Sequence, residues 1–125
     1  MYKRQDQENA LNGITAGIFG ASGQSCIAGS RLYLQKSIYS GFLDKLVNRA
    51  NKIKIGAPMD PNTQMGPLNS FKQLEIIEKN IKLTINQGGK IKCGGKRHTL
   101  SNKGYYFPAT IIECENHNLP TAENE

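Results

Sequence analysis

Residues 17–31 of the chain, from Gly17 to Arg31, have the sequence GIFGASGQSCIAGSR, in which four glycines surround one cysteine. Two kinds of site use such a segment: a glycine-rich turn that holds a phosphate, and a turn that presents a reactive thiol. The two alternatives predict different proteins. The spacing of the glycines and the rest of the sequence distinguish between them.

The phosphate alternative fails on the spacing of its glycines. A dinucleotide-binding turn has the pattern G-x-G-x-x-G between a strand and a helix. Here the glycines stand at positions 17, 20, 23 and 29. Apolar residues at Ala10, Leu11, Ile14 and Ile18 predict a helix over residues 7–19 instead of a strand. A P-loop also needs a lysine after its last glycine, and no lysine occurs between residues 5 and 35.

The thiol alternative agrees better with the residues around the cysteine. Gly20 and Gly23 are predicted to end the helix and to form a tight turn, and Cys26 follows directly. A thiol on such a turn is exposed, and free backbone N–H groups beside it can bind an oxyanion. However, a lone cysteine is more often a buried, inert residue. The residue pattern alone therefore leaves both outcomes open for Cys26.

The remaining pattern predicts an α/β fold in which helices alternate with strands of a mostly parallel sheet. Ser70 and Gln73 form a capping box that starts one helix, and Gly88 is predicted to end it in the left-handed conformation. Pro108 predicts an edge position or a bulge in its strand. The expected elements are helices at 37–52 and 70–88, an irregular segment at 54–68, and strands at 31–35, 90–93 and 105–113.

Composition and charge narrow the class of protein. The chain has 125 residues, of which 38% are hydrophobic and 21% are charged, as in one globular domain. The net charge is +6, but the cations are scattered and no aromatic residues alternate with them, so no nucleic-acid partner is expected. No apolar run is long enough to cross a membrane. Three cysteines form no disulfide framework. We therefore expect a soluble, cytoplasmic protein.

Four motifs in order resemble the aldehyde dehydrogenase superfamily. The segment from Phe19 to Arg31 is similar to the active-site cysteine signature of this family, with its Gly-Gln-x-Cys core. The other three are GAPMDPNTQMGPL at 56–68, GGKIKCGG at 88–95 and GYYFPAT at 104–110. The resemblance covers residues 6–125, which are expected to form a partial catalytic domain truncated at both ends. Residues 1–5 resemble nothing in the family and are expected to be a leader outside it.

The resemblance implies a role for particular residues. Cys26 would be the catalytic nucleophile, which attacks an aldehyde and forms a thiohemiacetal that is oxidised with NAD or NADP to a thioester. Glu125 stands where the family has a glutamate that contacts the nicotinamide ribose. Gln73 stands where many relatives contact the adenosine ribose, although its capping role explains it equally well. The complete parent is expected to be a homodimer or homotetramer, and the 125-residue chain alone is expected to be inactive.

Three alternatives remain at this stage. A CoA-acylating semialdehyde dehydrogenase of the same superfamily would use the same cysteine. A small basic zinc module would pair Cys93 with His98 and Cys114 with His117, although no metal site is expected. A cysteine hydrolase would pair Cys26 with either histidine. The sequence does not identify the aldehyde or choose between NAD and NADP.

Overall fold

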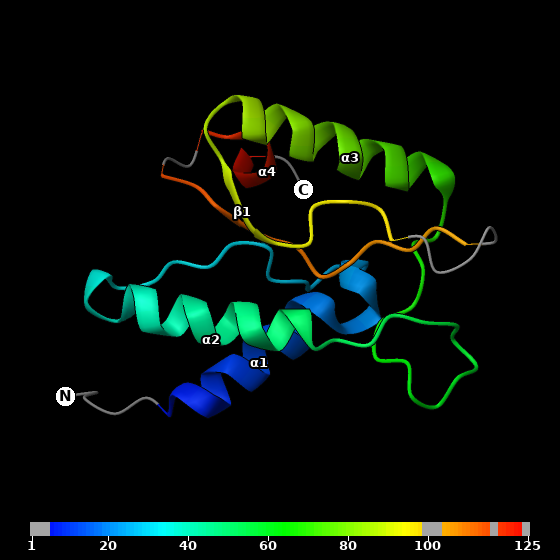
Figure 1. The fold of residues 1–125 in the computed structure, drawn as a ribbon, viewed down its shortest axis with the longest axis horizontal. Helices are drawn as coiled ribbons and strands as arrows, with labels where there is room; N and C mark the ends of the chain where they lie inside the picture. Colours follow the sequence, from blue (N-terminus) through cyan, green and yellow to red (C-terminus); the bar gives the residue numbers. More distant parts are fainter. Residues whose placement is uncertain (1–5, 99–103, 116–117, 124–125) are drawn as a thin grey trace.

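The computed structural model describes residues 6–98, 104–115 and 118–123, arranged as four α-helices and two short strands (Figure 1). Short 3₁₀ segments, η1 (Gly20–Gly23) and η2 (Lys36–Ile38), follow α1 and precede α2. The remaining elements are α1 (Gln7–Phe19), α2 (Tyr39–Asn51), α3 (Phe71–Asn86), β1 (Lys90–Cys93), β2 (Ile111–Glu113) and α4 (Pro120–Glu123). None of these described helices has the length and apolar character that crossing a bilayer requires.

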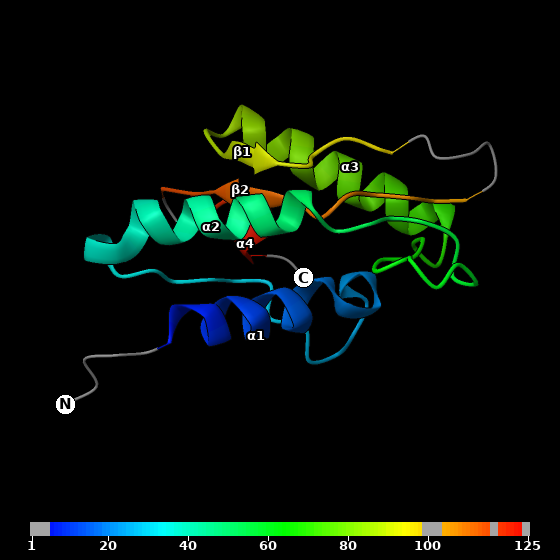
Figure 2. The same cartoon turned by 60° about the horizontal axis from the view of Figure 1, so that its bottom comes forward.

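The helices cover both faces of the strand pair, as Figures 1 and 2 show. On one face, Leu74 and Ile81 of α3 are buried in a cluster with Phe107, and Ile112 packs against them. On the other face, Ile111 packs against two clusters, one containing Ala50 of α2 and one formed between α1 and α2. Because consecutive strand residues point to opposite faces, β2 joins the two halves of the core.

The strand pairing corrects one part of the prediction. The sequence predicted a mostly parallel sheet, but β1 and β2 pair antiparallel, with Lys90 opposite Glu113 and a register shift between Ile91 and Cys93. In an antiparallel pair the two strands run in opposite directions, so neither strand continues the direction of the other as in a parallel sheet. Within the described residues, the one parallel pairing is an isolated bridge between Ile55 and Met65.

Two predicted strands also differ in extent. Residues 31–35 are not assigned to a strand, because a strand needs a hydrogen-bonded neighbour and the described residues supply none there. The strand expected over residues 105–113 is paired only from Ile111 to Glu113. Pro108 has no N–H to donate to a neighbouring strand, which agrees with its position outside the paired residues.

The caps of α3 agree with the sequence. The Ser70 hydroxyl accepts a hydrogen bond from the Gln73 N–H at 3.2 Å, which confirms this half of the predicted capping box. Among the described residues, the Gln73 side chain makes no return bond to the Ser70 N–H. At the other end Gly88 has a φ of 99°, and its N–H donates to the Ile85 carbonyl at 3.0 Å. A positive φ at this position is the reason that glycine ends the helix.

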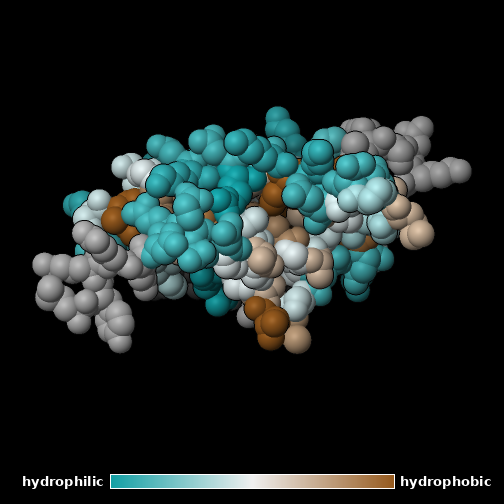
Figure 3. All heavy atoms as spheres, turned by 90° about the horizontal axis from the view of Figure 1, so that it is seen from below, coloured by the Kyte–Doolittle hydropathy of each residue, from teal (hydrophilic) through white to brown (hydrophobic). Residues whose placement is uncertain are grey.

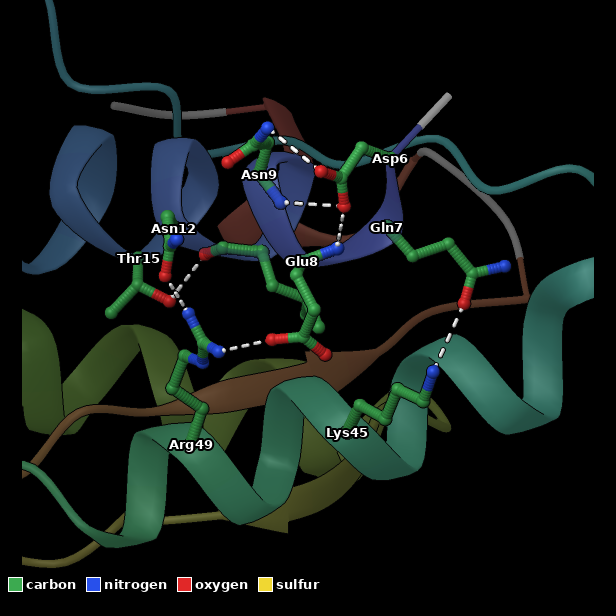
Figure 4. Close-up of polar contacts among 9 residues, drawn as sticks. Asp6, Gln7, Glu8, Asn9, Asn12, Thr15, Lys45 and Arg49 are labelled. Carbon is green, nitrogen blue, oxygen red and sulfur yellow. Dashed lines mark hydrogen bonds and ion pairs between the residues drawn. The ribbon is translucent and has the colours of Figure 1, made fainter. Parts of the chain in front are cut away.

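Polar contacts hold α1 against α2 (Figure 4). Leu11 of α1 is buried between these helices together with Phe42 and Leu46. On the exposed side the Arg49 guanidinium reaches back to α1, donating to the Glu8 carboxylate at 2.8 Å and also to the Asn12 side chain. Directional bonds and apolar burial thus hold the first half of α1 against α2, and the cysteine segment follows the other end of this helix.

Candidate functional site

Cys26 lies on an exposed turn just after η1. The turn is closed by the Ala28 N–H, which donates to the Ser25 carbonyl at 3.0 Å. In the part of the chain that the structure describes, the N–H groups of Ser25 and Cys26 donate no hydrogen bond. The predicted exposed turn is therefore confirmed, and free amides beside the thiol can bind an oxyanion. The catalytic role of Cys26 stays a prediction at this point.

The three cysteines differ in their surroundings. Cys26 is exposed, Cys114 is half-buried and Cys93 is buried. The Cys93 thiol approaches the Ala109 carbonyl at 3.6 Å, and burial raises its pKa. Cys93 is therefore a core residue, whereas Cys26 is accessible to a substrate.

An unusual backbone conformation precedes the cysteine. Ala21, Ser22 and Gly23 have φ values of 49°, 56° and 71°, so three consecutive residues are left-handed. Only the glycine adopts this conformation without a steric cost. Gly20, which the sequence also assigned to the turn, has an ordinary φ of −55°. The left-handed residues 21–23 therefore lead from the end of α1 into the turn that carries Cys26.

Two side chains attach this turn to a segment far away in the sequence. The Ser22 hydroxyl donates to the Gly66 carbonyl at 2.9 Å, and the Gln24 side-chain oxygen accepts from the Asn69 N–H at 2.9 Å. Figure 1 shows the end of α1 beside the green segment that leads into α3. Gln24 belongs to the cysteine signature, but the sequence around it does not indicate these contacts. The only available signal was a polar side chain two residues before the cysteine.

The partner segment, residues 65–69, is itself held firmly. Met65 is buried, its N–H donates to the Lys54 carbonyl at 3.1 Å, and its carbonyl accepts from the Gly56 N–H at 3.2 Å. Leu68 is also buried, and its N–H donates to the Tyr105 carbonyl at 2.8 Å. The 65–69 segment therefore has its own attachment to the core on both sides of Gly66.

A groove of about 560 Å³ runs between α1, residues 29–34, α2 and β2. Its walls are mainly apolar, and they include Ile14, Ile18, Phe19, Leu32 and Ile111. Neither Cys26 nor Gln73 lines it. The groove is therefore a separate feature from the cysteine turn.

The polar end of the groove contains a linked group of side chains. The Tyr39 hydroxyl donates to the Glu113 carboxylate, and Lys92 lies 2.9 Å from the same carboxylate. The hydrogen bond to Glu113, with burial, raises the pKa of Tyr39 to about 12. The same hydrogen bond, followed by the one from Lys92, lowers the pKa of Glu113. This group joins the start of α2 to both strands.

The other predicted site residues have separate positions. Gln73 lies in the first turn of α3, where its backbone N–H takes part in the cap. Glu125 and His117 lie outside the described residues. The described residues contain no group of three His, Cys, Asp or Glu side chains suited to a metal ion. Cys93, which would be a ligand in the alternative of a zinc module, has its sulfur directed to a backbone carbonyl in the core.

Hydrophobic side chains also reach the surface near the turn. Ile27, next to Cys26, is 86% exposed, and Tyr33 is 82% exposed. Figure 3 shows hydrophobic residues that protrude from an otherwise mainly hydrophilic face.

Comparison with known proteins gives a consistent result. Residues 1–125 match the family model described as "Aldehyde dehydrogenase family". A (Z)-2-((N-methylformamido)methylene)-5-hydroxybutyrolactone dehydrogenase from Acinetobacter baylyi is 44% identical over 109 residues, which are 87% of this chain and 22% of that protein. Retinal dehydrogenase 2 of Homo sapiens is 34% identical over 120 residues, which are 96% of this chain and 23% of that protein.

Solved structures agree with these sequence matches. An aldehyde dehydrogenase from Bacillus cereus in complex with NAD+ superimposes with a TM-score of 0.91 at 35% identity, covering 98% of this chain and 25% of that chain. A betaine aldehyde dehydrogenase from Staphylococcus aureus, also in complex with NAD+, gives a TM-score of 0.93 at 32% identity with the same coverage. The chain thus spans about a quarter of the length of the relatives it matches.

Proposed function

Because the chain belongs to the aldehyde dehydrogenase family, we propose that it forms the cysteine-bearing part of an enzyme that oxidises an aldehyde to a carboxylic acid. Its fold is that of part of an aldehyde dehydrogenase catalytic domain, as the sequence predicted. The observation that carries the proposal is the exposed thiol of Cys26 on a turn with free amides.

The proposed chemistry begins at the sulfur of Cys26. Its thiolate attacks the aldehyde carbonyl carbon, and the oxyanion that forms accepts hydrogen bonds from backbone N–H groups of the turn. Loss of hydride from this thiohemiacetal leaves a thioester on Cys26. Water then cleaves the thioester, which releases the carboxylic acid and restores the thiol. The oxidation needs a hydride acceptor, and NAD(P)+ supplies that chemistry when it is bound.

The described residues form little of a dinucleotide site by themselves. The glycines of the opening segment follow a helix, so they do not make the turn between strand and helix that holds a pyrophosphate. Gln73 offers a partly exposed side chain at the start of α3. Since the relatives are about four times as long, we place most of the cofactor site outside this chain. A homodimeric or homotetrameric assembly of the complete protein stays a prediction.

The test uses the complete polypeptide that carries this sequence. The purified protein is mixed with a panel of aldehydes and with NAD+ or NADP+, and NAD(P)H absorbance is followed. Cys26→Ala should abolish the signal, because the thioester no longer forms. Cys114→Ser, which changes a half-buried cysteine away from the turn, is the matched control and should retain activity. A parallel assay with CoA distinguishes acyl-CoA formation from release of the acid.

Two results would contradict the proposal. One is aldehyde oxidation that persists at the unmodified rate in the Cys26→Ala protein. The other is a complete, folded protein that reduces neither dinucleotide with any aldehyde of the panel. The 125-residue chain alone is predicted to give no turnover, and NAD(P)-dependent oxidation by that chain would show this prediction to be wrong.

A further inference from the structure

We propose that Gln24 and Ser22 are positioning residues, which fix the Cys26 turn to the 65–69 segment so that the thiol keeps one location. The inference rests on the proposed role of Cys26 as the nucleophile. It concerns the two hydrogen bonds that hold the cysteine turn. Their partners, Gly66 and Asn69, lie outside the cysteine signature.

The two contacts restrain the turn from both sides of Gly23. Ser22 donates to the Gly66 carbonyl and Gln24 accepts from the Asn69 N–H, both at 2.9 Å. Cys26 comes two residues after Gln24, so the backbone between them spans at most about 7 Å. A displacement of Gln24 is therefore passed almost directly to the thiol.

The left-handed backbone makes these contacts necessary. Ala21 and Ser22 hold positive φ values that are unfavourable for residues with a side chain. The local sequence does not favour this conformation, so contacts elsewhere must maintain it. In the described residues, the hydroxyl of Ser22 and the amide of Gln24 are the side-chain groups between residues 20 and 24 that bond to a distant segment.

The partner segment does not depend on the turn for its own position. Met65 and Leu68 are buried in two different clusters of the core, and their backbone bonds go to Lys54, Gly56 and Tyr105. Removal of the Gln24 side chain should therefore loosen the turn and leave the 65–69 segment in place. A general contribution to folding would instead loosen both the turn and the 65–69 segment, so the two roles can be distinguished.

The sequence contains a matched control for this test. Gln64 also has a side-chain oxygen that accepts from a backbone N–H, that of Lys54, at 2.9 Å. Gln24→Ala and Gln64→Ala therefore delete the same kind of exposed hydrogen bond, one at the cysteine turn and one away from it. Gln24→Glu keeps an acceptor at the same chain length and is the conservative variant that should restore the contact.

The first readout is amide hydrogen exchange of the 125-residue chain, followed by mass spectrometry. Gln24→Ala should raise exchange about fivefold in peptides covering residues 20–29, as expected for the loss of one hydrogen bond. The Asn69 amide loses its acceptor and should also exchange faster, whereas peptides within residues 65–68 should be unchanged. Gln64→Ala should leave residues 20–29 as in the unmodified chain, and Ser22→Ala should act in the same direction as Gln24→Ala.

The second readout is kinetic and uses the complete polypeptide. The value of kcat is expressed per folded molecule, with the folded fraction measured by circular dichroism, so loss of folded protein does not affect it. Gln24→Ala should lower kcat about 10-fold to 100-fold with KM for the aldehyde little changed, because a displaced nucleophile affects the reacting geometry. Gln24→Glu should recover most of the loss, and Gln64→Ala should have no such effect.

The outcomes separate the two proposals. If the unmodified complete polypeptide has no Cys26-dependent activity, the proposed function is wrong. If it is active, and Gln24→Ala matches Gln64→Ala in both exchange and kcat, the positioning role is wrong and the proposed function stands. If Gln24→Ala speeds exchange at residues 20–29 and lowers kcat, and Gln24→Glu restores kcat, both the proposed function and the positioning role are supported.

Discussion

The hydrogen bond between Tyr39 and Glu113 should give the fold a stability that disappears at high pH. It joins the start of α2 to the end of β2, and Lys92 contacts the other oxygen of the same carboxylate. Tyr39→Phe removes one oxygen atom and keeps the ring. Tyr33→Phe is the matched control, because Tyr33 is 82% exposed and has no hydrogen-bond partner among the described residues.

The magnitude at neutral pH follows from the type of bond. A hydrogen bond to a charged acceptor contributes about 1.5–3 kcal/mol to stability. The Glu113 side chain is 19% exposed, and water weakens a partly exposed interaction, so the lower end applies. Tyr39→Phe should therefore reduce the free energy of unfolding by about 1.5 kcal/mol at pH 7.

The pH dependence has a definite sign. The pKa of Tyr39 is raised from 10.0 to about 12 in the folded chain, so the unfolded chain loses this proton first as the pH rises. At about pH 11, ionisation of Tyr39 in the unfolded chain lowers the free energy of unfolding by about 1.4 kcal/mol. The free energies of unfolding of the unmodified chain and of Tyr39→Phe should then be nearly equal. Cys93, whose pKa is raised by burial, is present in both proteins, so its effect cancels.

The assay is urea unfolding followed by circular dichroism at about pH 7, 9 and 11. Tyr33→Phe should match the unmodified chain at all three values. The argument is refuted if Tyr39→Phe is as stable as Tyr33→Phe at neutral pH, or if its deficit stays constant up to pH 11. On the acid side, the lowered pKa of Glu113 contributes stability that is present above its ordinary value of 4.5 and is lost at lower pH.

Three further predictions concern the elements that support the site. Leu74→Ala should reduce the free energy of unfolding by about 2–5 kcal/mol, measured by urea titration, because Leu74 is fully buried. Ser70→Ala should cost about 1 kcal/mol in the same titration and increase amide exchange in the first turn of α3. Gly56→Ala should lower the melting temperature, because its Cβ would overlap the Thr63 hydroxyl, and adding Thr63→Ala should recover the loss. An equal loss in the double variant would contradict this explanation.

The helices were predictable from the sequence because their signals are local. The apolar spacing around Leu11, the cap at Ser70 and the positive φ at Gly88 each depend on residues within one or two turns. Within the predicted strand 105–113, Tyr106 and Phe107 are buried, whereas Tyr105 is 40% exposed.

The strands and the supports of the site were less predictable because they depend on distant partners. Residues 31–35 have the composition of a strand, but pairing needs a neighbour that the described residues do not provide. The cysteine turn was identified from its motif, whereas the partners of Ser22 and Gln24 lie 44 and 45 residues away. No local pattern predicts a contact between a side chain and a backbone group at such a separation.

The distance in sequence between the turn and its supports also sets the order in which the site is assembled. Gly66 and Asn69 leave the ribosome long after Cys26, and the bond from Leu68 to Tyr105 adds another 37 residues. Contacts so far apart form late in folding, since the intervening chain must first close a loop. Throughout synthesis of that stretch the thiol is carried on an unsupported segment. Nascent chains therefore carry the cysteine before the two hydrogen bonds that position it can form.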